Sequence, residues 1–251
     1  MDQININHIL KSVLDVGELM LTSGAEVNRV EDTIQRMMRA YGCVKVDVFT
    51  ITSSIVVTAC TKNGDIYTQT RRIYAYETNL NKLEMCNALS RDICRELLEE
   101  RELQKSVQSI REKKDYSDIA LFLAYGGISL VFSVFFGGTL SDGVAACFCG
   151  FLLFVCTKLL NCLQLQRIIH TIIASMCVGV GAVLLTSMGI GKSVDLIIIG
   201  NIMLLIPGIS LTTSLRDMIS GDIISGLLGL SDAVIRAVAI AVGIALVLWK
   251  F

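Results

Sequence analysis

The spacing of apolar residues over positions 1–40 predicts two amphipathic helices. Apolar side chains recur every three or four residues over 5–22 and again over 25–40, with polar residues between them. Ser23 followed three residues later by Glu26 has the pattern of a capping box. We therefore expect Ser23 to cap the start of the second helix.

The next stretch has the apolar–polar alternation that is typical of strands. Three short runs rich in β-branched residues predict strands at 44–51, 55–61 and 66–73. Asn63-Gly64, between the last two, predicts a tight hairpin. Residues 79–113 have helical spacing and become highly charged, so we expect one long helix that ends as a solvated stalk. The predicted fold of this part is α+β, with helices packed on a small antiparallel sheet.

Beyond residue 115 the chain is dominated by apolar windows with little charge. A helix needs about 20 apolar residues to cross the hydrocarbon core of a bilayer. Five windows approach that length, at 119–136, 143–160, 168–189, 196–215 and 231–249. Residues 223–230 are too few to cross, so we expect them at the interface or re-entering the membrane. This half is predicted to be an all-α polytopic membrane domain of about five transmembrane helices.

The distribution of charge divides the chain at the same place. Residues 1–114 hold 16 Lys/Arg and 16 Asp/Glu, whereas residues 115–251 hold 6 and 7. We therefore predict a cytoplasmic domain over 1–114 and a transmembrane domain over 115–251. The net charge of −1 contains no basic excess, which argues against nucleic acid as a partner.

The positions of Lys and Arg predict the orientation in the membrane. Basic residues concentrate on one side of the predicted spans, at Arg111, Lys113, Lys114, Lys158, Arg167 and Arg216. The opposite side has only Lys192 and Lys250. By the positive-inside rule, the N-terminal domain is cytoplasmic and the C-terminus is outside the cell membrane.

The residues that could form a metal or redox centre are not arranged for one. The nine cysteines include no CxxC pair, and the two histidines, His8 and His170, fall in different predicted domains. Unpaired thiols in a reducing compartment are the expected state. No catalytic motif is present in the sequence, so we predict no enzyme activity, no metal and no cofactor.

The predicted fourth span contains the single proline of the chain, in Ile206-Pro207-Gly208. Proline removes a helical hydrogen bond, and many secondary transporters build their substrate sites from helices broken at mid-depth. The candidate substrate-binding residues are Asn201, Pro207, Gly208, Thr212, Thr213 and Arg216. The alternatives are a kinked helix whose hydroxyl groups bond to their own backbone, and an interhelical hydrogen bond for Asn201. The guanidinium of Arg216 is expected to bind the substrate carboxylate at the cytoplasmic entrance. Alternatively, Arg216 is only one of the basic residues that mark the cytoplasmic side of the membrane.

Carboxylates near such a break are candidates for carrying a coupling proton, because a low-dielectric cavity raises the pKa of an acid. The candidates are Asp217, Asp222 and Asp232. Asp232 comes four residues before Arg236 on the predicted fifth helix, so a structural ion pair is an equal alternative for that residue.

Several segments together resemble the N-terminal part of the threonine/serine exporter family, and they follow the family's order along nearly the whole chain. They are Ser23-Gly24-Ala25-Glu26-Val27-Asn28-Arg29-Val30-Glu31-Asp32-Thr33, Thr70-Arg71-Arg72, Thr78-Asn79-Leu80, Asn87-Ala88-Leu89-Ser90-Arg91, Pro207-Gly208, Leu215-Arg216-Asp217-Met218-Ile219-Ser220-Gly221-Asp222 and Ser225-Gly226. The resemblance implies an inner-membrane exporter of small amino acids, with a cytoplasmic domain and about five spans. Because the chain has no ATP-binding motif, transport would be driven by an ion gradient or by another subunit.

Full-length members of this family carry a second membrane region, and here the chain stops at Phe251. The chain therefore resembles the split form, in which a separate short membrane protein supplies the rest; homo-oligomers could form as well. Split members include exporters of dicarboxylates such as succinate. The expected substrate is threonine or serine, with a dicarboxylate as the alternative.

Glu26, Arg29 and Asp32 lie at helical spacings in the first of these segments. They are candidates for a cytoplasmic gating or regulatory site, and salt bridges on a solvated helix face are the alternative. Together with Glu31, these carboxylates leave two other functions open. One is a membrane-anchored enzyme, and the other is a sensor that uses the cytoplasmic domain.

Overall fold

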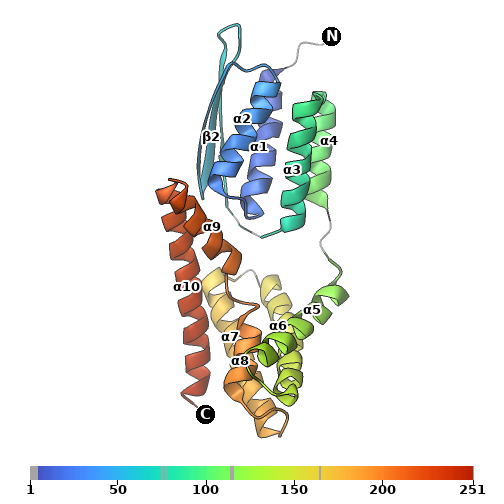
Figure 1. The fold of residues 1–251 in the computed structure, drawn as a ribbon, viewed down its shortest axis with the longest axis vertical. Coiled ribbons are helices and arrows are strands. Elements are labelled where there is room, and N and C mark those ends of the chain that lie inside the picture. Colours follow the sequence, from blue (N-terminus) through green and yellow to red (C-terminus); the bar gives the residue numbers. More distant parts are fainter. Residues whose placement is uncertain (1–4, 75, 77, 114–115, 164, 251) are drawn as a thin grey trace. The chain divides into compact units, whose positions relative to one another are not determined.

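The computed structural model describes residues 5–74, 76, 78–113, 116–163 and 165–250, which fold into two compact units (Figure 1). The first unit combines Met1–Lys114 with Gly208–Ser231, and the second combines Asp115–Pro207 with Asp232–Phe251. The second unit begins at residue 115, where the predicted transmembrane domain begins. Residues 208–231 of that predicted domain, however, pack with the N-terminal residues.

The first unit begins with the two predicted helices, α1 (Ile6–Thr22) and α2 (Val27–Ala40). Their apolar faces are buried together, and Leu10, Val13 and Met37 are fully inaccessible to solvent. The prediction of two amphipathic helices is confirmed. The predicted cap is wrong, because Ser23 is the C-cap residue of α1 and α2 begins after Glu26, whose side chain makes no capping hydrogen bond.

The predicted three-stranded sheet is also confirmed. Its strands are β1 (Lys45–Ile51), β2 (Ser54–Cys60) and β3 (Ile66–Arg72), paired antiparallel in the order β1-β2-β3. Gly64 has φ +89° in the turn between β2 and β3, a conformation that glycine adopts without strain. Ile55, Val57 and Ala59 of β2 are completely buried, so one face of the sheet covers the helices.

The long helix predicted over 79–113 is wrong. The structure has two helices instead, α3 (Leu80–Arg95) and α4 (Glu100–Glu112). Between them the Tyr41 hydroxyl donates a hydrogen bond to the carbonyl oxygen of Leu98 at 3.0 Å. Leu103, Val107 and Ile110 form an apolar stripe that buries α4 against the core, so α4 packs as a helix of the first unit and is not a solvated stalk. Figure 1 shows α1 and α2 between the sheet and the α3–α4 pair.

The first unit is completed by α9 (Gly208–Ile219) and the first turns of α10 (Ile223–Leu248). These helices approach closely because small residues face each other: a Cβ on Gly226 would lie 2.6 Å from the carbonyl oxygen of Ser214. Residues 223–230, expected at the interface or re-entering, are instead the beginning of the long helix α10.

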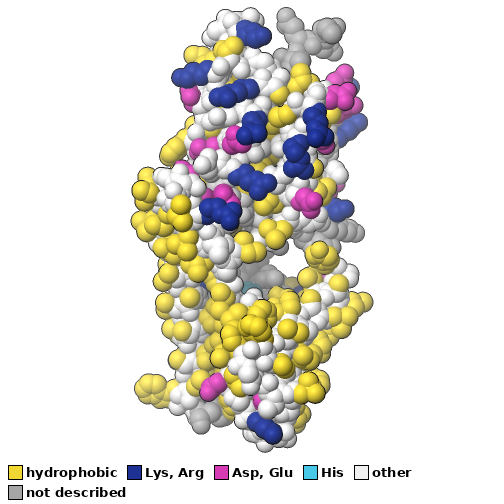
Figure 2. Space-filling model, in the orientation of Figure 1, with side chains coloured by type: hydrophobic (Ala, Val, Ile, Leu, Met, Phe, Trp, Pro, Cys, Tyr) yellow, Lys and Arg dark blue, Asp and Glu magenta, His cyan; other side chains and the backbone are white. Residues whose placement is uncertain are grey.

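The second unit contains α5 (Asp118–Phe135), α6 (Leu140–Cys162), α7 (Arg167–Ser187), α8 (Val194–Ile202) and the rest of α10. In the described part of the chain, four helices are long and apolar enough to cross a membrane: α5, α6, α7 and α10. These four correspond to four of the five predicted spans. The predicted span 196–215 is divided between α8 and α9, and neither has the length of a span. Hydrophobic side chains cover much of the visible surface of this unit (Figure 2).

Candidate functional site

The helix break predicted at Pro207 is confirmed. Helix α8 ends at Ile202, residues 203–205 form turns, residue 206 is a bend, and α9 begins at Gly208. The amide of Leu205 donates to the carbonyl oxygen of Ile202 at 2.8 Å, so the chain tightens as α8 ends. The break separates the candidate substrate-binding residues, because Asn201 and Pro207 belong to the second unit and the others belong to the first.

The hydroxyl groups that follow the break bond to their own helix. Thr212 Oγ1 donates to the carbonyl oxygens of Gly208, at 3.1 Å, and Ile209, at 2.9 Å. Thr213 Oγ1 donates to the Ile209 carbonyl at 3.0 Å. This is the arrangement that the alternative of a kinked helix predicted. Each hydroxyl oxygen still has lone pairs with which to accept a hydrogen bond.

Asn201 forms the interhelical hydrogen bonds that were its alternative role. Its side-chain oxygen accepts from Ser129 Oγ of α5 at 2.9 Å, and its amide nitrogen donates to the Ala146 carbonyl of α6 at 3.2 Å. The same nitrogen donates to the Ile197 carbonyl of α8 at 2.9 Å. The residue is fully buried and joins three helices of the second unit.

The contact between α9 and the start of α2 brings together residues from two of the predicted groups. The guanidinium of Arg216 forms an ion pair with the carboxylate of Glu26. Asp217 Oδ1 accepts a hydrogen bond from the backbone amide of Val27 at 3.1 Å, across 190 positions of sequence. Asp217 therefore provides the N-terminal cap that the sequence assigned to Ser23. We call these four residues, Glu26, Val27, Arg216 and Asp217, the α2–α9 junction.

Asp217 is the buried acid of the junction, with 7% of its surface exposed. Burial raises the pKa of this carboxyl group to about 6, and the negative charges of Asp222 and Glu26 act in the same direction. The hydrogen bond from Val27 and the positive charge of Arg216 oppose the rise in pKa. Asp217 can therefore change its charge near neutral pH while it caps α2.

A second carboxylate of α2 lies in the same electrostatic environment. Glu31 Oε1 accepts a hydrogen bond from the backbone amide of Thr50 at 2.6 Å, which ties α2 to β1. Burial raises the pKa of Glu31, and the charge of Asp222 contributes to the rise. The coupling candidate Asp222 thus interacts with an acid on α2 as well as with Asp217. Among the described residues no group of His, Cys, Asp or Glu is arranged to hold a metal ion, and all nine cysteines are free thiols.

The remaining candidates lie apart from the junction. Arg29 is exposed on α2, and Asp32 forms an exposed ion pair with Arg36 at 2.8 Å, as expected for a solvated helix face. Asp232 pairs with Arg236 at 2.5 Å within α10, in the second unit. Of the predicted gating and coupling residues, only Glu26, Asp217 and Asp222 come together.

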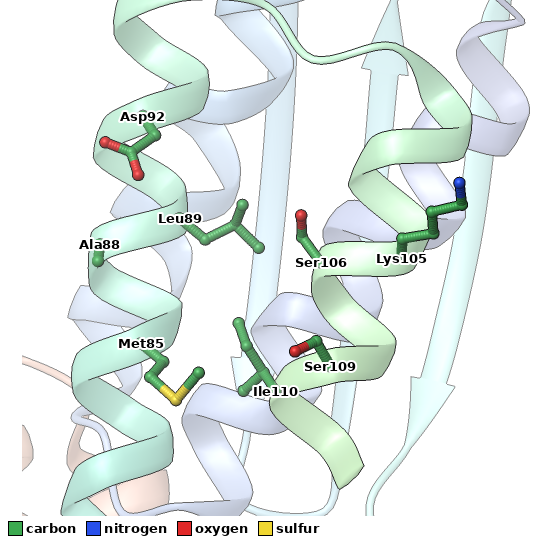
Figure 3. Close-up of a pocket in the computed structure, with 8 residues that line it drawn as sticks. All are labelled: Met85, Ala88, Leu89, Asp92, Lys105, Ser106, Ser109 and Ile110. Carbon is green, nitrogen blue, oxygen red and sulfur yellow. The ribbon is translucent and has the colours of Figure 1, made fainter. Parts of the chain in front are cut away.

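The pocket between α3 and α4 contains none of the predicted residues (Figure 3). It has a volume of about 420 Å³. Leu89 and Ile110 form part of its apolar wall, and Asp92 and Lys105 are its charged side chains.

Comparison with known proteins identifies the family of this sequence. The sequence model of the threonine/serine exporter family, ThrE, matches residues 11–249 and so includes the junction, the helix break and all four long apolar helices. The chain belongs to the threonine/serine exporter family. Members of this family are transporters, and the four apolar helices agree with a multi-pass membrane protein.

A curated relative supports the same assignment. The protein of Mycobacterium tuberculosis (strain ATCC 25618 / H37Rv) named "Probable threonine/serine exporter" is 26% identical over an alignment of 251 positions that covers 97% of this chain. The match covers 46% of that protein, so the chain spans less than half the length of its relative. No solved structure matches the chain.

Proposed function

We propose that this chain is the part of a secondary exporter of threonine and serine that contains the cytoplasmic domain and the first membrane region. The observation that carries the proposal is the family match over residues 11–249, which runs without interruption through both units. The curated relative favours threonine and serine over the dicarboxylate alternative. An ion gradient is the proposed energy source.

The segments that make up the first unit support five membrane crossings, with the C-terminus outside. The chain leaves this unit before α5 and returns to it at α9, and α10 starts there as well. Helices α5, α6 and α7 provide three crossings, so a return to the starting side requires a fourth. The predicted span 196–215, which ends before Asp217, is the proposed fourth crossing, and α10 is the fifth. The N-terminal domain is then cytoplasmic by the Lys/Arg bias.

The junction supports a gating role for Glu26 and a substrate role for Arg216. Threonine and serine each carry a carboxylate, and a guanidinium binds a carboxylate with two parallel hydrogen bonds. In the structure the guanidinium of Arg216 is already paired with the carboxylate of Glu26. In the proposed mechanism the substrate carboxylate competes with Glu26 for Arg216, and this competition loosens α9 from α2.

Asp217 is the favoured candidate for the coupling proton. Its pKa of about 6 allows it to take up a proton in the cytoplasmic pH range, and because burial in the closed junction raises this pKa, protonation favours the closed junction. Proton uptake and substrate binding would then act on the same contact. Asp222 contributes through its charge, and the roles proposed for Asp232, Asn201, Pro207, Gly208, Thr212 and Thr213 remain predictions.

The second membrane region of the exporter is proposed to come from a separate short membrane protein. The match covers 46% of the relative, and the proposed partner would supply the counterpart of the remaining sequence. Affinity purification of the tagged chain from mild detergent, followed by mass spectrometry, would identify such a partner. Recovery of the chain alone or as a homo-oligomer, with full transport activity, would contradict this part of the proposal.

Export is tested in cells that lack their own threonine exporters. Cells loaded with a threonine-containing peptide accumulate threonine, and we expect the chain with its partner to accelerate release of threonine and serine into the medium. Cells expressing either protein alone are the control. Release of succinate without release of threonine or serine would contradict the substrate assignment, and release of none of the three would contradict the exporter proposal.

A further inference from the structure

A groove between α2 and α3 collects arginine side chains from both helices. It has a volume of about 760 Å³. Its charged residues are Asp32, Arg36, Arg39, Arg91 and Arg95, and its uncharged polar ones include Thr33, Asn87, Ser90 and Cys94. Lys and Arg side chains are gathered over the face that α2 and α3 present in Figure 2. The junction and the α3–α4 pocket do not share these arginines.

The positive charge of the groove is only partly balanced by the protein. Asp32 pairs with Arg36 at 2.8 Å. Within the described part of the chain, Arg39, Arg91 and Arg95 form no ion pair. The spacing also costs stability, because Arg36 and Arg39 are three residues apart on α2, and Arg91 and Arg95 are four apart on α3. Like charges at these spacings repel each other along a helix.

The helix dipole explains part of this arrangement. Arg39 and Arg95 are in the last turns of α2 and α3, where a positive side chain is favoured. The dipole does not explain why both helices direct their arginines into one groove, nor why Arg91 adds a charge one turn earlier. A ligand with several negative charges would explain both.

We infer that the α2–α3 groove binds a small polyanion that carries phosphate groups and acts on the exporter from the cytoplasmic domain. Four guanidinium groups exceed what one substrate carboxylate needs, and the planar fork of arginine matches phosphate geometry. The volume is within the range of small-molecule sites. The phosphate could belong to a soluble diphosphate or to an anionic lipid headgroup, and the test separates these two sources.

Cys94 provides a native reporter of binding. Its thiol lines the groove and is exposed to solvent. A bound anion covers this thiol and so slows its alkylation. Cys60, which is partly exposed on β2 and outside the groove, is the internal control.

The experiment measures alkylation of Cys94 by N-ethylmaleimide in the full chain, in phosphatidylcholine nanodiscs at physiological salt. Pyrophosphate and ADP are added in one arm, and nanodiscs that contain cardiolipin form the other arm. We expect one arm to slow the reaction of Cys94 and to leave that of Cys60 unchanged. Protection by pyrophosphate or ADP assigns a soluble ligand, and protection only in cardiolipin nanodiscs assigns a lipid headgroup.

Variants test whether the arginines are responsible. In Arg91→Gln/Arg95→Gln, the ligand concentration or lipid fraction for half-protection should rise by about tenfold or more, because two charge-assisted contacts are lost. Arg101→Gln, an equivalent change of an exposed residue at the start of α4, should behave as the unmodified chain does. Protection in neither arm, equal protection by sulfate at the same concentration, or unchanged protection in the double variant would overturn the inference. None of these measurements requires transport, so they are independent of the proposed export function.

Discussion

Replacing Asp217 with asparagine isolates the charge of the junction from its hydrogen bond. The asparagine side chain keeps an oxygen that can accept from the Val27 amide, now 3.1 Å from Asp217 Oδ1, but it cannot ionise. In the unmodified chain, Asp217 has a pKa of about 6 when buried and an ordinary value of 3.8 when exposed. The closed junction therefore binds more protons than the open one between these two values.

The sign and size of the pH effect follow from that difference. The contribution of Asp217 to closing is fully present below pH 3.8 and is lost as the pH rises through about 6. Between pH 8 and pH 5, linkage between these two pKa values gives about 1.4 kcal/mol of extra closing free energy, or about a tenfold lower opening constant. Asp217→Asn should show no such dependence, and it should close more tightly than the unmodified chain at pH 8.

Hydrogen exchange of the full chain in detergent measures this opening directly. The amides at the start of α2, from Val27 to Val30, are followed at several pH values, and each rate is normalised to the intrinsic rate at that pH. Asp32→Asn is the matched control, because it removes an exposed carboxylate of the same helix that pairs only with its neighbour Arg36. Equal protection of these amides at pH 5 and pH 8 in the unmodified chain, or an unchanged pH dependence in Asp217→Asn, would refute the role of Asp217.

Three other predictions concern transport, packing and topology. Arg216→Lys keeps the positive charge but loses the paired N–H donors of the guanidinium that bind a carboxylate. We therefore expect strongly reduced export with normal membrane insertion. Export at the rate of the unmodified protein would reduce Arg216 to a topology marker. Asn201→Leu removes two hydrogen bonds between helices and one within α8, and it should destabilise the chain in detergent by about 1–2 kcal/mol, measured as a lower midpoint of thermal unfolding. An unchanged midpoint would contradict a stabilising role for these hydrogen bonds. Reporter fusions should place residue 60 in the cytoplasm and residue 250 outside, and both on one side would contradict five crossings.

The parts of the fold that local pattern determines could be predicted from the sequence. Helices α1 and α2 and the three strands have the expected bounds to within two residues, because their apolar periodicity and the Asn63-Gly64 turn are local signals. The break at Pro207 was predicted for the same reason, since proline acts on its own helix.

The errors concern interactions between distant segments. Helix α4 was expected to be a solvated stalk because its charged residues outnumber the buried stripe of Leu103, Val107 and Ile110. The cap of α2 was assigned to Ser23 because no local signal reveals that a carboxylate 190 residues away accepts from Val27. For the same reason the sequence did not predict that α9 packs with the N-terminal residues.

The candidate site was predictable in its residue types but not in its grouping. Arg216, Asp217, Asp222 and Glu26 were each selected for their chemistry, under three separate roles. Their arrangement in one contact depends on tertiary packing of α9 against α2. Thr212 and Thr213 were also chosen for their hydroxyl groups, but tertiary packing does not bring them into this contact. Both hydroxyls instead donate to backbone carbonyls of α9.

Transport in inside-out membrane vesicles tests the central claim most directly, because the cytoplasmic side then faces the medium. The vesicles contain this chain and the proposed partner, and uptake of radiolabelled threonine is measured with and without an imposed proton gradient, acidic inside. We predict uptake that requires the gradient, that unlabelled serine inhibits, and that falls strongly in Asp217→Asn. Asp47→Asn, which changes an exposed carboxylate of β1 that pairs with Lys45, should transport normally. Uptake that is independent of every ion gradient, or the absence of threonine and serine uptake from vesicles that contain both proteins, would contradict the account.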